Sequence, residues 1–327
     1  MSGERETFWD AVKGVAIIAV ILIHTTSHNS LGGVVWRQFI NFPVALFFFM
    51  AGYFCHAKES YGVFVARKAK RLLVPLGVAA LVYGTIELYF ANHVGQTLTA
   101  ARIGSAFLSF PLAWGYFVLA LFQCMVLAPF LTRHIRARWM LPMSVVAYSA
   151  TALYFYLAST VFMGGWTLSH SIPIIFCTAW LPLFVLGIRL QNRRLTVWTP
   201  GIRPYAVLSL LLVWAVAGGI YWHGAATIQL ARSQLRLPCI LFALVLAGLL
   251  PNLADRYYLR GRIWSVLARL GEMSFFVYLW HRLALIALRS ILPQFIEWHF
   301  AFAIILFAVL ALVLPRSMAK RLWCLGV

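Results

Sequence analysis

The chain has 327 residues, of which 63% are hydrophobic and only 11% are charged, and its formal net charge is +19 at pH 7. This apolar fraction exceeds that of soluble globular domains, so the composition excludes an ordinary soluble protein and predicts a chain that faces lipid. The basic residues are spread over many short segments instead of one polar face, which excludes nucleic-acid binding as the reason for the charge. No long polar stretch interrupts the sequence, and we expect a single transmembrane domain over residues 1–327.

Ten apolar segments are each long enough to cross a hydrocarbon core of about 30 Å. We therefore predict an all-α, polytopic membrane protein. Acidic residues precede the first segment and no small-residue cleavage site follows it, which favours a retained helix over a signal peptide. The predicted segments are 8–25, 39–55, 72–91, 113–131, 140–162, 172–188, 205–222, 236–251, 266–288 and 298–315.

The distribution of Lys and Arg predicts the orientation of these segments. With a cytoplasmic N-terminus, nineteen of the 27 basic residues fall in segments on the cytoplasmic side. This bias fits the positive-inside rule and predicts that both termini are cytoplasmic. The basic residues on the opposite side are Arg37, Arg102, Arg232, Arg236 and Arg289.

The first apolar segment carries two ionisable residues eleven positions apart, Lys13 and His24, with no other polar residue between them. Eleven residues of α-helix make about three turns, so both side chains share one face about 16 Å apart. Asp10 joins the same face three residues before Lys13. Because ionisable groups inside a membrane span are expensive, this pattern predicts a functional path or site.

Two later segments carry further ionisable groups at matching depth. In the predicted orientation Glu87 lies near the outer end of segment 72–91, and His281 lies in the outer half of segment 266–288. Both would share one level with His24 if the three helices are neighbours. Glu272 is expected to pair with a neighbouring Arg, whereas interfacial placement at outer helix ends is sufficient to explain His93, His223 and His299.

The cysteine and histidine patterns indicate neither a disulfide framework nor a metal site. The five cysteines are odd in number and show no C-x-x-C spacing. His24 and His28 have the i, i+4 spacing of a two-histidine metal face, but no Glu accompanies them. We therefore expect no bound metal.

Five segments, in order, resemble the integral-membrane acyltransferase-3 family. The first helix of that family carries Arg or Lys, then ten residues, then His, as in FWDAVKGVAIIAVILIHT here. Later helices resemble its aromatic second helix, its basic motif before helix three, its Trp-led fourth helix and its late Leu-Gly-x-x-Ser…Tyr-Leu-x-His signature. The matching stretches are FPVALFFFMAGYF (42–54), RKAKRLLVP (67–75), WGYFVLALFQCMVLAPFL (114–131) and LGEMSFFVYLWH (270–281).

This resemblance implies an activity and a location. Members of the family move an acyl group, usually acetyl from acetyl-CoA, onto sugar hydroxyls of surface polysaccharides, lipopolysaccharide or antibiotics. The implied partners are acetyl-CoA, a polysaccharide or lipid-linked glycan and other polysaccharide-assembly proteins, in the bacterial cytoplasmic (inner) membrane. The chain departs from the family pattern at Lys13, where Arg is common, and at Ala51, where Ser usually precedes Gly-Tyr. We also expect no appended extracytoplasmic hydrolase-like domain, unlike some members of the family.

The residues themselves suggest how such a transfer would work. A neutral imidazole, whose ordinary pKa is about 6.5, is suited to take the proton from an attacking sugar hydroxyl. His24 is then the base, or alternatively it attacks first and carries the acyl group. Glu87 or His281 would orient His24 or bind the acceptor. The predicted donor site comprises the basic cluster Lys58, Arg67, Lys68, Lys70 and Arg71, which would hold the CoA phosphates, and Asp10 and Lys13, which would line the inner mouth of the path to His24.

Two other classes of function, a transporter and a scaffold, are alternatives to an acyltransferase. A transporter or flippase for a polysaccharide precursor usually shows repeated halves with broken helices, and the sequence shows no clear repeat. A non-catalytic scaffold of an export complex would give no reason for Lys13 and His24 inside a membrane helix. The sequence therefore favours an acyltransferase, with the acceptor sugar and the choice between acetyl and succinyl left open.

Overall fold

The computed structural model describes residues 3–25, 30–135, 137–160, 173–192, 202–225, 227–256, 261–315 and 326. Over these residues the structure is helical and contains no strand, which confirms the all-α prediction. The elements are α1 (Gly3–Thr25), α2 (Leu31–Ile40), α3 (Pro43–Tyr53), α4 (Tyr61–His93), α5 (Ala100–Ser109), the π-helix η1 (Phe110–Trp114), α6 (Tyr116–Arg133), α7 (Met140–Thr160), the 3-10 helix η2 (Cys177–Ala179), α9 (Leu181–Asn192), α10 (Ile202–Gly224), α11 (Ile228–Arg232), α12 (Leu237–Arg256), α13 (Arg262–Glu272), α14 (Ser274–Ile291), η3 (Pro293–Trp298) and α15 (His299–Val313).

Eight helical segments of the described residues are long and apolar enough to cross a membrane, which confirms a polytopic membrane protein. Two shorter apolar helices, Leu181–Gln191 and His299–Val313, overlap the remaining predicted segments, 172–188 and 298–315. The number of spans and the side on which the termini lie remain predictions. The eight long segments are Thr7–Thr25, Leu31–Tyr53, Tyr61–His93, Tyr116–Arg133, Met140–Thr160, Ile202–Gly224, Ile228–Ala254 and Ser274–Ile291.

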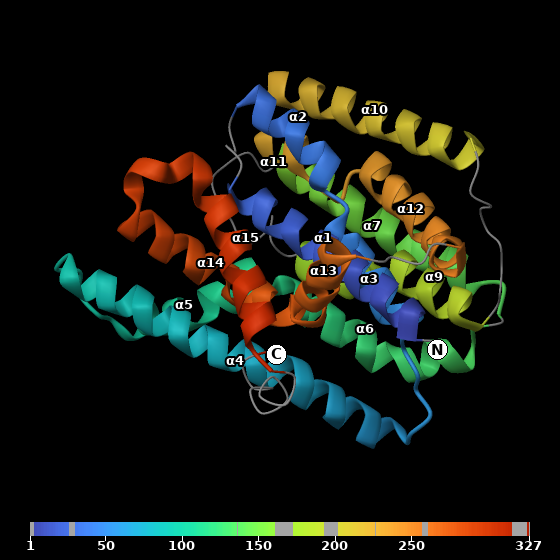
Figure 1. Cartoon of the computed structure of the whole chain (residues 1–327), viewed down its shortest axis with the longest axis horizontal. Helices are drawn as coiled ribbons and strands as arrows, with labels where there is room; N and C mark the ends of the chain where they lie inside the picture. The colour runs from blue at the N-terminus through green and yellow to red at the C-terminus, as the bar shows by residue number, and fades with distance from the viewer. Residues whose placement is uncertain are drawn as a thin grey trace.

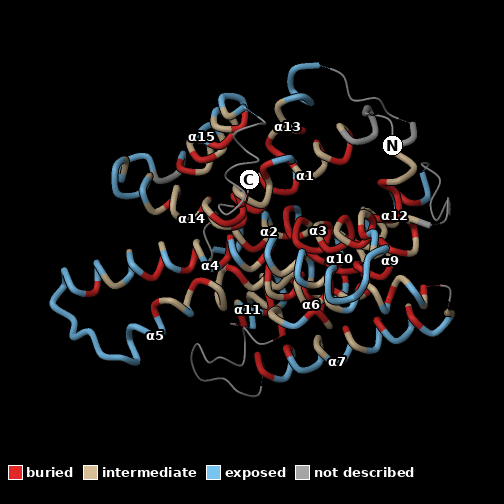
Figure 2. The backbone as a smooth tube through the Cα atoms, turned by 90° about the horizontal axis from the view of Figure 1, so that it is seen from below, coloured by how far each residue is buried: buried red, intermediate tan, exposed pale blue. Residues whose placement is uncertain are grey.

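The helices form a bundle in which α1 runs through the middle, between α4 along one edge and α10 along the opposite edge (Figure 1). The largest fully buried side chains come mainly from α1, α3, α9 and α12, and they include Trp9, Phe48, Phe49 and Phe184. Phe48 stacks on Trp180 with ring centroids 5.1 Å apart. In Figure 2 the buried residues gather around α3, whereas α5 and much of α7 are exposed. We infer that the exposed apolar faces meet lipid.

Glycines allow the central helices to cross at very short range. A Cβ on Gly14 or Gly271 would lie 2.1 or 1.8 Å from a carbonyl oxygen of the facing helix, α13 or α1. The same holds at the crossing of α3 and α9, where a Cβ on Gly52 or Gly187 would lie 2.1 or 2.2 Å from a facing carbonyl oxygen. Small residues at helix interfaces are the usual means of close backbone approach in membranes. These two crossings fix α1 and α3, and therefore the side chains that they carry.

The prediction of one continuous helix over 266–288 is wrong. The structure divides this segment at Met273 into α13 and α14. The physical reason is the close crossing at Gly271, because α13 lies along α1 and the chain must change direction before it continues as α14. The change of direction brings α14 to the far end of α1.

Helix α4 is longer than its predicted apolar segment. It has 33 residues, which correspond to about 50 Å of helix, well beyond a hydrocarbon core of about 30 Å. Its first turns therefore carry the basic residues past the apolar region. Its other end forms a hairpin with α5, which projects at the left of Figure 1. Below, the two ends of the bundle are called the Lys13 end and the His24 end, after the two residues of α1.

Candidate active site

Two histidine rings meet at the His24 end. His24 lies in the last turn of α1, and its ring centroid is 5.1 Å from that of His281 on α14. It is also 5.1 Å from the ring centroid of Trp114. His24 is half-buried and His281 is buried, with 4% of its surface exposed. The structure thus brings together two of the three residues that the sequence analysis placed at one level.

Backbone contacts fix the tautomer of His281. Its Nδ1 lies 2.8 Å from the carbonyl oxygen of Tyr278 and 3.1 Å from that of Val277. Because a carbonyl oxygen only accepts hydrogen bonds, Nδ1 carries the proton and Nε2 carries the lone pair. Nε2 is buried and has no hydrogen-bond partner among the described residues. His281 therefore presents an unused acceptor atom inside the protein, beside the ring of His24.

A tyrosine hydroxyl interrupts α14 next to His281. The Tyr83 hydroxyl donates to the carbonyl oxygen of Leu279 at 3.2 Å and accepts from the N–H of Leu283 at 2.8 Å. In an uninterrupted helix those two backbone groups bond to each other. A side chain inserted in this way bends a helix. Tyr83, which stacks on Phe110 at 4.1 Å, thus sets the local path of the turn that carries His281.

The π-helix η1 positions Trp114 against His24. Single π-turns often occur at functional sites, because the extra residue redirects the side chains that follow. The Tyr278 hydroxyl donates to the carbonyl oxygen of Trp114 at 2.5 Å. The guanidinium of Arg282 lies over the Trp114 ring, 3.5 Å from its centroid. Trp114 is thus held from two sides by α14.

Trp114 forms part of the wall of two cavities. The first, which we call the His24 cavity, has a volume of about 450 Å³. The second, which we call the Glu87 cavity, has a volume of about 420 Å³ and contains Glu87 and Arg282 on opposite elements. Polar and aromatic residues of the His24 cavity include His24, Arg37, Trp114, Tyr116, Phe155, Gln229, Arg232, Ser233, Gln234 and Tyr278.

Glu87 lies at the His24 end, as expected, but in the neighbouring cavity. Its Oε2 accepts a hydrogen bond from the Ser109 hydroxyl at 2.8 Å. Ser109 is brought there by the hairpin between α4 and α5. Trp114 and Ala113 line both cavities, so the Glu87 cavity and the His24 cavity share part of their wall at η1.

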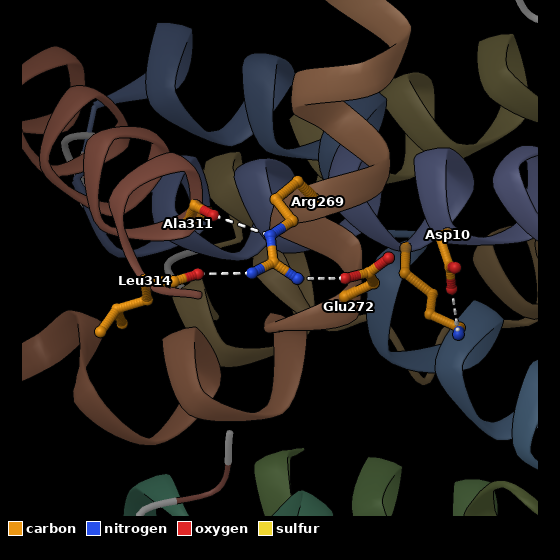
Figure 3. A network of polar contacts seen from close by, with 6 residues as sticks. Asp10, Arg269, Glu272, Ala311 and Leu314 are labelled. Carbon is orange, nitrogen blue, oxygen red and sulfur yellow. Dashed lines mark hydrogen bonds and ion pairs between the residues drawn. The ribbon is translucent and has the colours of Figure 1, made fainter. Parts of the chain in front are cut away.

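Charges at the Lys13 end are paired locally. The Lys13 ammonium lies 2.7 Å from Oδ1 of Asp10, which is labelled in Figure 3. It also lies 5.7 Å from the ring centroid of Phe54. Beside this pair, Arg269 and Glu272 form an ion pair at 2.5 Å, which confirms the expected partner of Glu272.

Arg269 also joins α13 to the end of α15. It donates to the carbonyl oxygens of Ala311 at 2.8 Å and of Leu314 at 2.5 Å (Figure 3). A cation at the C-terminal end of a helix satisfies carbonyls that have no partner within the helix.

The predicted CoA-binding residues lie at or just before the start of α4, except Asp10 and Lys13 on α1. Arg67 pairs with Glu59 at 2.8 Å, and the half-buried Lys68 lies 5.4 Å from the ring centroid of Phe64. Lys58, Lys70 and Arg71 are exposed. None of these basic residues lines the two cavities at the His24 end.

The remaining histidine predictions have mixed outcomes. His28 lies outside the described residues. The interfacial placement of His299 is wrong: its side chain is buried, with 1% exposed, and its Nε2 lies 2.9 Å from the carbonyl oxygen of Leu292. Within the described ranges, no group of three or more His, Cys, Asp or Glu side chains is arranged to hold a metal ion.

Sequence reasoning missed several residues of this site. Nothing in the sequence assigns Tyr83 and Arg282 to the site, apart from the presence of a polar group in an apolar helix. The sequence does point to Arg37 and Arg232, because both lie on the side of the membrane that the positive-inside rule predicts to be poor in basic residues. A cation that the positive-inside rule does not explain is a candidate for a functional role.

The fold and the site define a polytopic helical membrane protein with a histidine pair beside a cavity at one end of its bundle. The sequence matches the acyltransferase-3 family, described as an acyltransferase domain, over residues 6–316. The chain therefore belongs to this family and is a multi-pass membrane acyltransferase. No curated protein and no solved structure matches the chain.

Proposed function

We propose that this protein transfers an acetyl group from cytoplasmic acetyl-CoA to a sugar hydroxyl of an exopolysaccharide or another cell-surface glycan. The location would be the bacterial cytoplasmic membrane, and the whole chain would act as one acyltransferase domain. The observation that carries the proposal is the contact of the His281 ring with the ring of His24, which lines a cavity of about 450 Å³. Family membership supports an acyl donor but does not specify acetyl-CoA.

At the His24 end the chemistry is acyl transfer to a hydroxyl. The sugar oxygen attacks the thioester carbonyl, its proton moves to an imidazole nitrogen, and the CoA thiolate leaves and is reprotonated. In the alternative, His24 attacks first and the hydroxyl then takes the acyl group from an acyl-histidine. In both cases Nε2 of His281 is available to accept a proton or a hydrogen bond, because Nδ1 is committed to the backbone.

At the Lys13 end the proposal assigns the basic residues to the donor. CoA phosphates would meet Lys13 and the cluster of Arg67, Lys68, Lys70 and Arg71. Asp10 would keep the Lys13 ammonium in place. The thioester would then reach His24 along α1, a path of about 16 Å on one helix face.

Glu87 is assigned to the acceptor. A carboxylate that accepts from Ser109 still has lone pairs for sugar hydroxyls. Its cavity shares Ala113 and Trp114 with the His24 cavity, so a glycan longer than one sugar unit would occupy both sides of Trp114. Trp114 itself offers an aromatic face to a sugar ring.

The test is acetyl transfer by the purified protein in nanodiscs. We expect release of CoA together with acetate bound to a de-O-acetylated surface polysaccharide from a strain that lacks the gene. The His24→Ala variant, purified in parallel, should give neither product. A wild-type protein that moves a lipid-linked precursor across vesicles, without releasing CoA, would instead support the transporter function.

The orientation is tested separately with reporter fusions. Fusions after Arg102 and after Arg133 should report opposite sides of the membrane, with Arg133 in the cytoplasm. The same side for both reporters would contradict the proposed route of the donor from the cytoplasm to His24.

A further inference from the structure

Two arginines lie in the wall of the His24 cavity, on elements far apart in the sequence. Arg37 belongs to α2 and Arg232 to α11. Nε of Arg37 donates to the carbonyl oxygen of Arg232 at 3.1 Å, and Nη1 of Arg37 donates to that of Ile23, the neighbour of His24, at 3.4 Å. The Arg37 guanidinium is therefore held beside His24, and Arg232, whose backbone carbonyl accepts one of these bonds, lines the same cavity.

The known partners of these arginines carry no negative charge. The described ion pairs are Asp10–Lys13, Glu59–Arg67 and Glu272–Arg269, and none of them includes an arginine of the His24 cavity. A third arginine, Arg236, bonds to Gln38 and to the carbonyl oxygen of Ala215. Among the described residues, the two arginines of the His24 cavity thus form no ion pair, and Arg236, outside this cavity, bonds to neutral partners.

Polar atoms without partners also lie here. Nε of Arg232 and Oε1 of Gln234 are buried and have no hydrogen-bond partner among the described residues. Nε2 of Gln234 donates to the Tyr116 hydroxyl at 2.8 Å, so the amide is already oriented. Unpaired positive charge and an unused donor inside an apolar bundle are costly unless a ligand compensates them.

We infer that the His24 cavity binds an acidic group of the acceptor, a carboxylate or a phosphate, close to the hydroxyl that receives the acyl group. This inference rests on the proposed function and specifies its substrate class. Arginine is the residue best suited to such a group, because its fork of donors matches the oxygens of carboxylate and phosphate. The cavity contains aromatic rings as well, Trp114, Tyr116 and Tyr278, which supply apolar surface for the sugar.

The acceptor is a better source of this charge than the donor. The CoA phosphates are assigned to the Lys13 end, about 16 Å away along α1. An acetyl group carries no charge, so only a dicarboxylic acyl group could present a carboxylate here from the donor side. The experiment below separates these two sources.

The substitution that tests this inference most directly is Arg232→Gln. Its backbone carbonyl, which holds Arg37 and Asn41, is retained, while the guanidinium that has a buried unpaired Nε is removed. The matched control is Arg102→Gln, which removes the same charge from the exposed helix α5, outside both cavities. Arg232→Lys retains the positive charge without the fork.

The acceptor in the assay is the de-O-acetylated polysaccharide of the deletion strain, compared with the same polymer after carboxyl reduction or dephosphorylation. We expect wild type to show a KM at least about tenfold lower for the acidic polymer, as two charge-assisted hydrogen bonds imply. Arg232→Gln should remove most of this difference, Arg232→Lys should restore part of it, and Arg102→Gln should match wild type. The KM for acetyl-CoA should not change.

Three results would overturn the inference while leaving the proposed function intact. They are acylation of a polymer whose repeating unit has no acidic group, equal KM values for the acidic and neutralised polymers, and a transferred acyl group that mass spectrometry identifies as dicarboxylic on a neutral sugar. An equal loss of rate with both polymers in Arg232→Gln would also overturn it, because it would indicate a structural role or contact with lipid phosphate. No transfer by wild type to either polymer would instead contradict the proposed function itself.

Discussion

The two ends of α1 solve the problem of buried charge in different ways. At the Lys13 end, one cation on α1 and one on α13 each pair with a carboxylate three residues away, Lys13 with Asp10 and Arg269 with Glu272. At the His24 end the histidines and arginines meet carbonyls, amides and aromatic rings, and some buried nitrogens have no partner among the described residues. Within the described structure, carboxylates thus compensate Lys13 and Arg269, whereas no described ion pair compensates the arginines of the His24 cavity.

This difference indicates where a ligand is needed. Pairs three residues apart on one helix stabilise the fold without any ligand, although each contributes only a few tenths of a kcal/mol, roughly, when exposed. Polar groups assembled from α1, α2, α11 and α14 require a precise tertiary arrangement and still leave unused donors and acceptors. Such groups are typical of substrate sites. The predictions below test this contrast, from the largest expected effect to the smallest.

The glycine crossing at the Lys13 end should tolerate no side chain. In Gly271→Ala the new Cβ would meet the Asp10 carbonyl oxygen, so α1 and α13 must separate. We expect a loss of stability of about 3 kcal/mol or more and loss of activity, because the position of His24 depends on α1. The matched variant is Gly77→Ala on α4, where nothing lies within 4 Å of the added atom, and it should be neutral. Thermal unfolding in detergent measures both, and equal melting temperatures would contradict the proposed role of the crossing.

We expect His281 to contribute to the rate through its ring nitrogen Nε2. His281→Asn keeps a donor near the position of Nδ1 and removes Nε2, so the helix contacts to Val277 and Tyr278 can persist. We expect kcat to fall about 10²-fold, within the range for loss of a group that handles protons. His281→Gln, which places an amide near the position of Nε2, should retain more activity. If Asn and Gln variants behave alike, the assignment of the unused nitrogen is wrong.

The sequence predicts contacts between residues a few positions apart, but it does not predict contacts between residues that are far apart in the chain. The Asp10–Lys13 pair and the shared face of Lys13 and His24 follow from helical spacing, and the helices were predicted from runs of apolar residues. The pairing of Arg37 with Arg232 spans 195 positions and depends on how α2 meets α11. The division of segment 266–288 could not be predicted, because no proline interrupts the segment there. It results from the crossing with α1 at Gly271.

Tyr83 should influence the rate without binding substrate. Tyr83→Phe keeps the ring stacked on Phe110 but removes the hydroxyl from between Leu279 and Leu283. The turn of α14 can then close on itself and move His281. We expect kcat to fall about tenfold, with the KM for acetyl-CoA unchanged, which corresponds to roughly 1.4 kcal/mol. A changed KM with unchanged kcat would indicate contact with substrate and not positioning.

Lys13 should show the mildest effect, because it acts on a phosphate group close to solvent. We expect Lys13→Ala to raise the KM for acetyl-CoA about three- to tenfold and to leave kcat nearly unchanged, as removal of a partly screened charge implies. Lys13→Arg should resemble wild type, since Arg is common at this position of the family. Normal binding of acetyl-CoA by Lys13→Ala, measured by calorimetry, would count against this role.

The central claim is that the His24 end carries out acyl transfer, and one measurement tests it most directly. Polysaccharide-bound acetate is quantified in deletion strains that express wild type, His24→Ala or His93→Ala at matched membrane levels. His93, exposed at the end of α4, serves as the control for loss of an imidazole. The account predicts that acetate falls at least about 10²-fold in the His24→Ala strain and is unchanged in the His93→Ala strain. Wild-type acetate in the His24→Ala strain would contradict it.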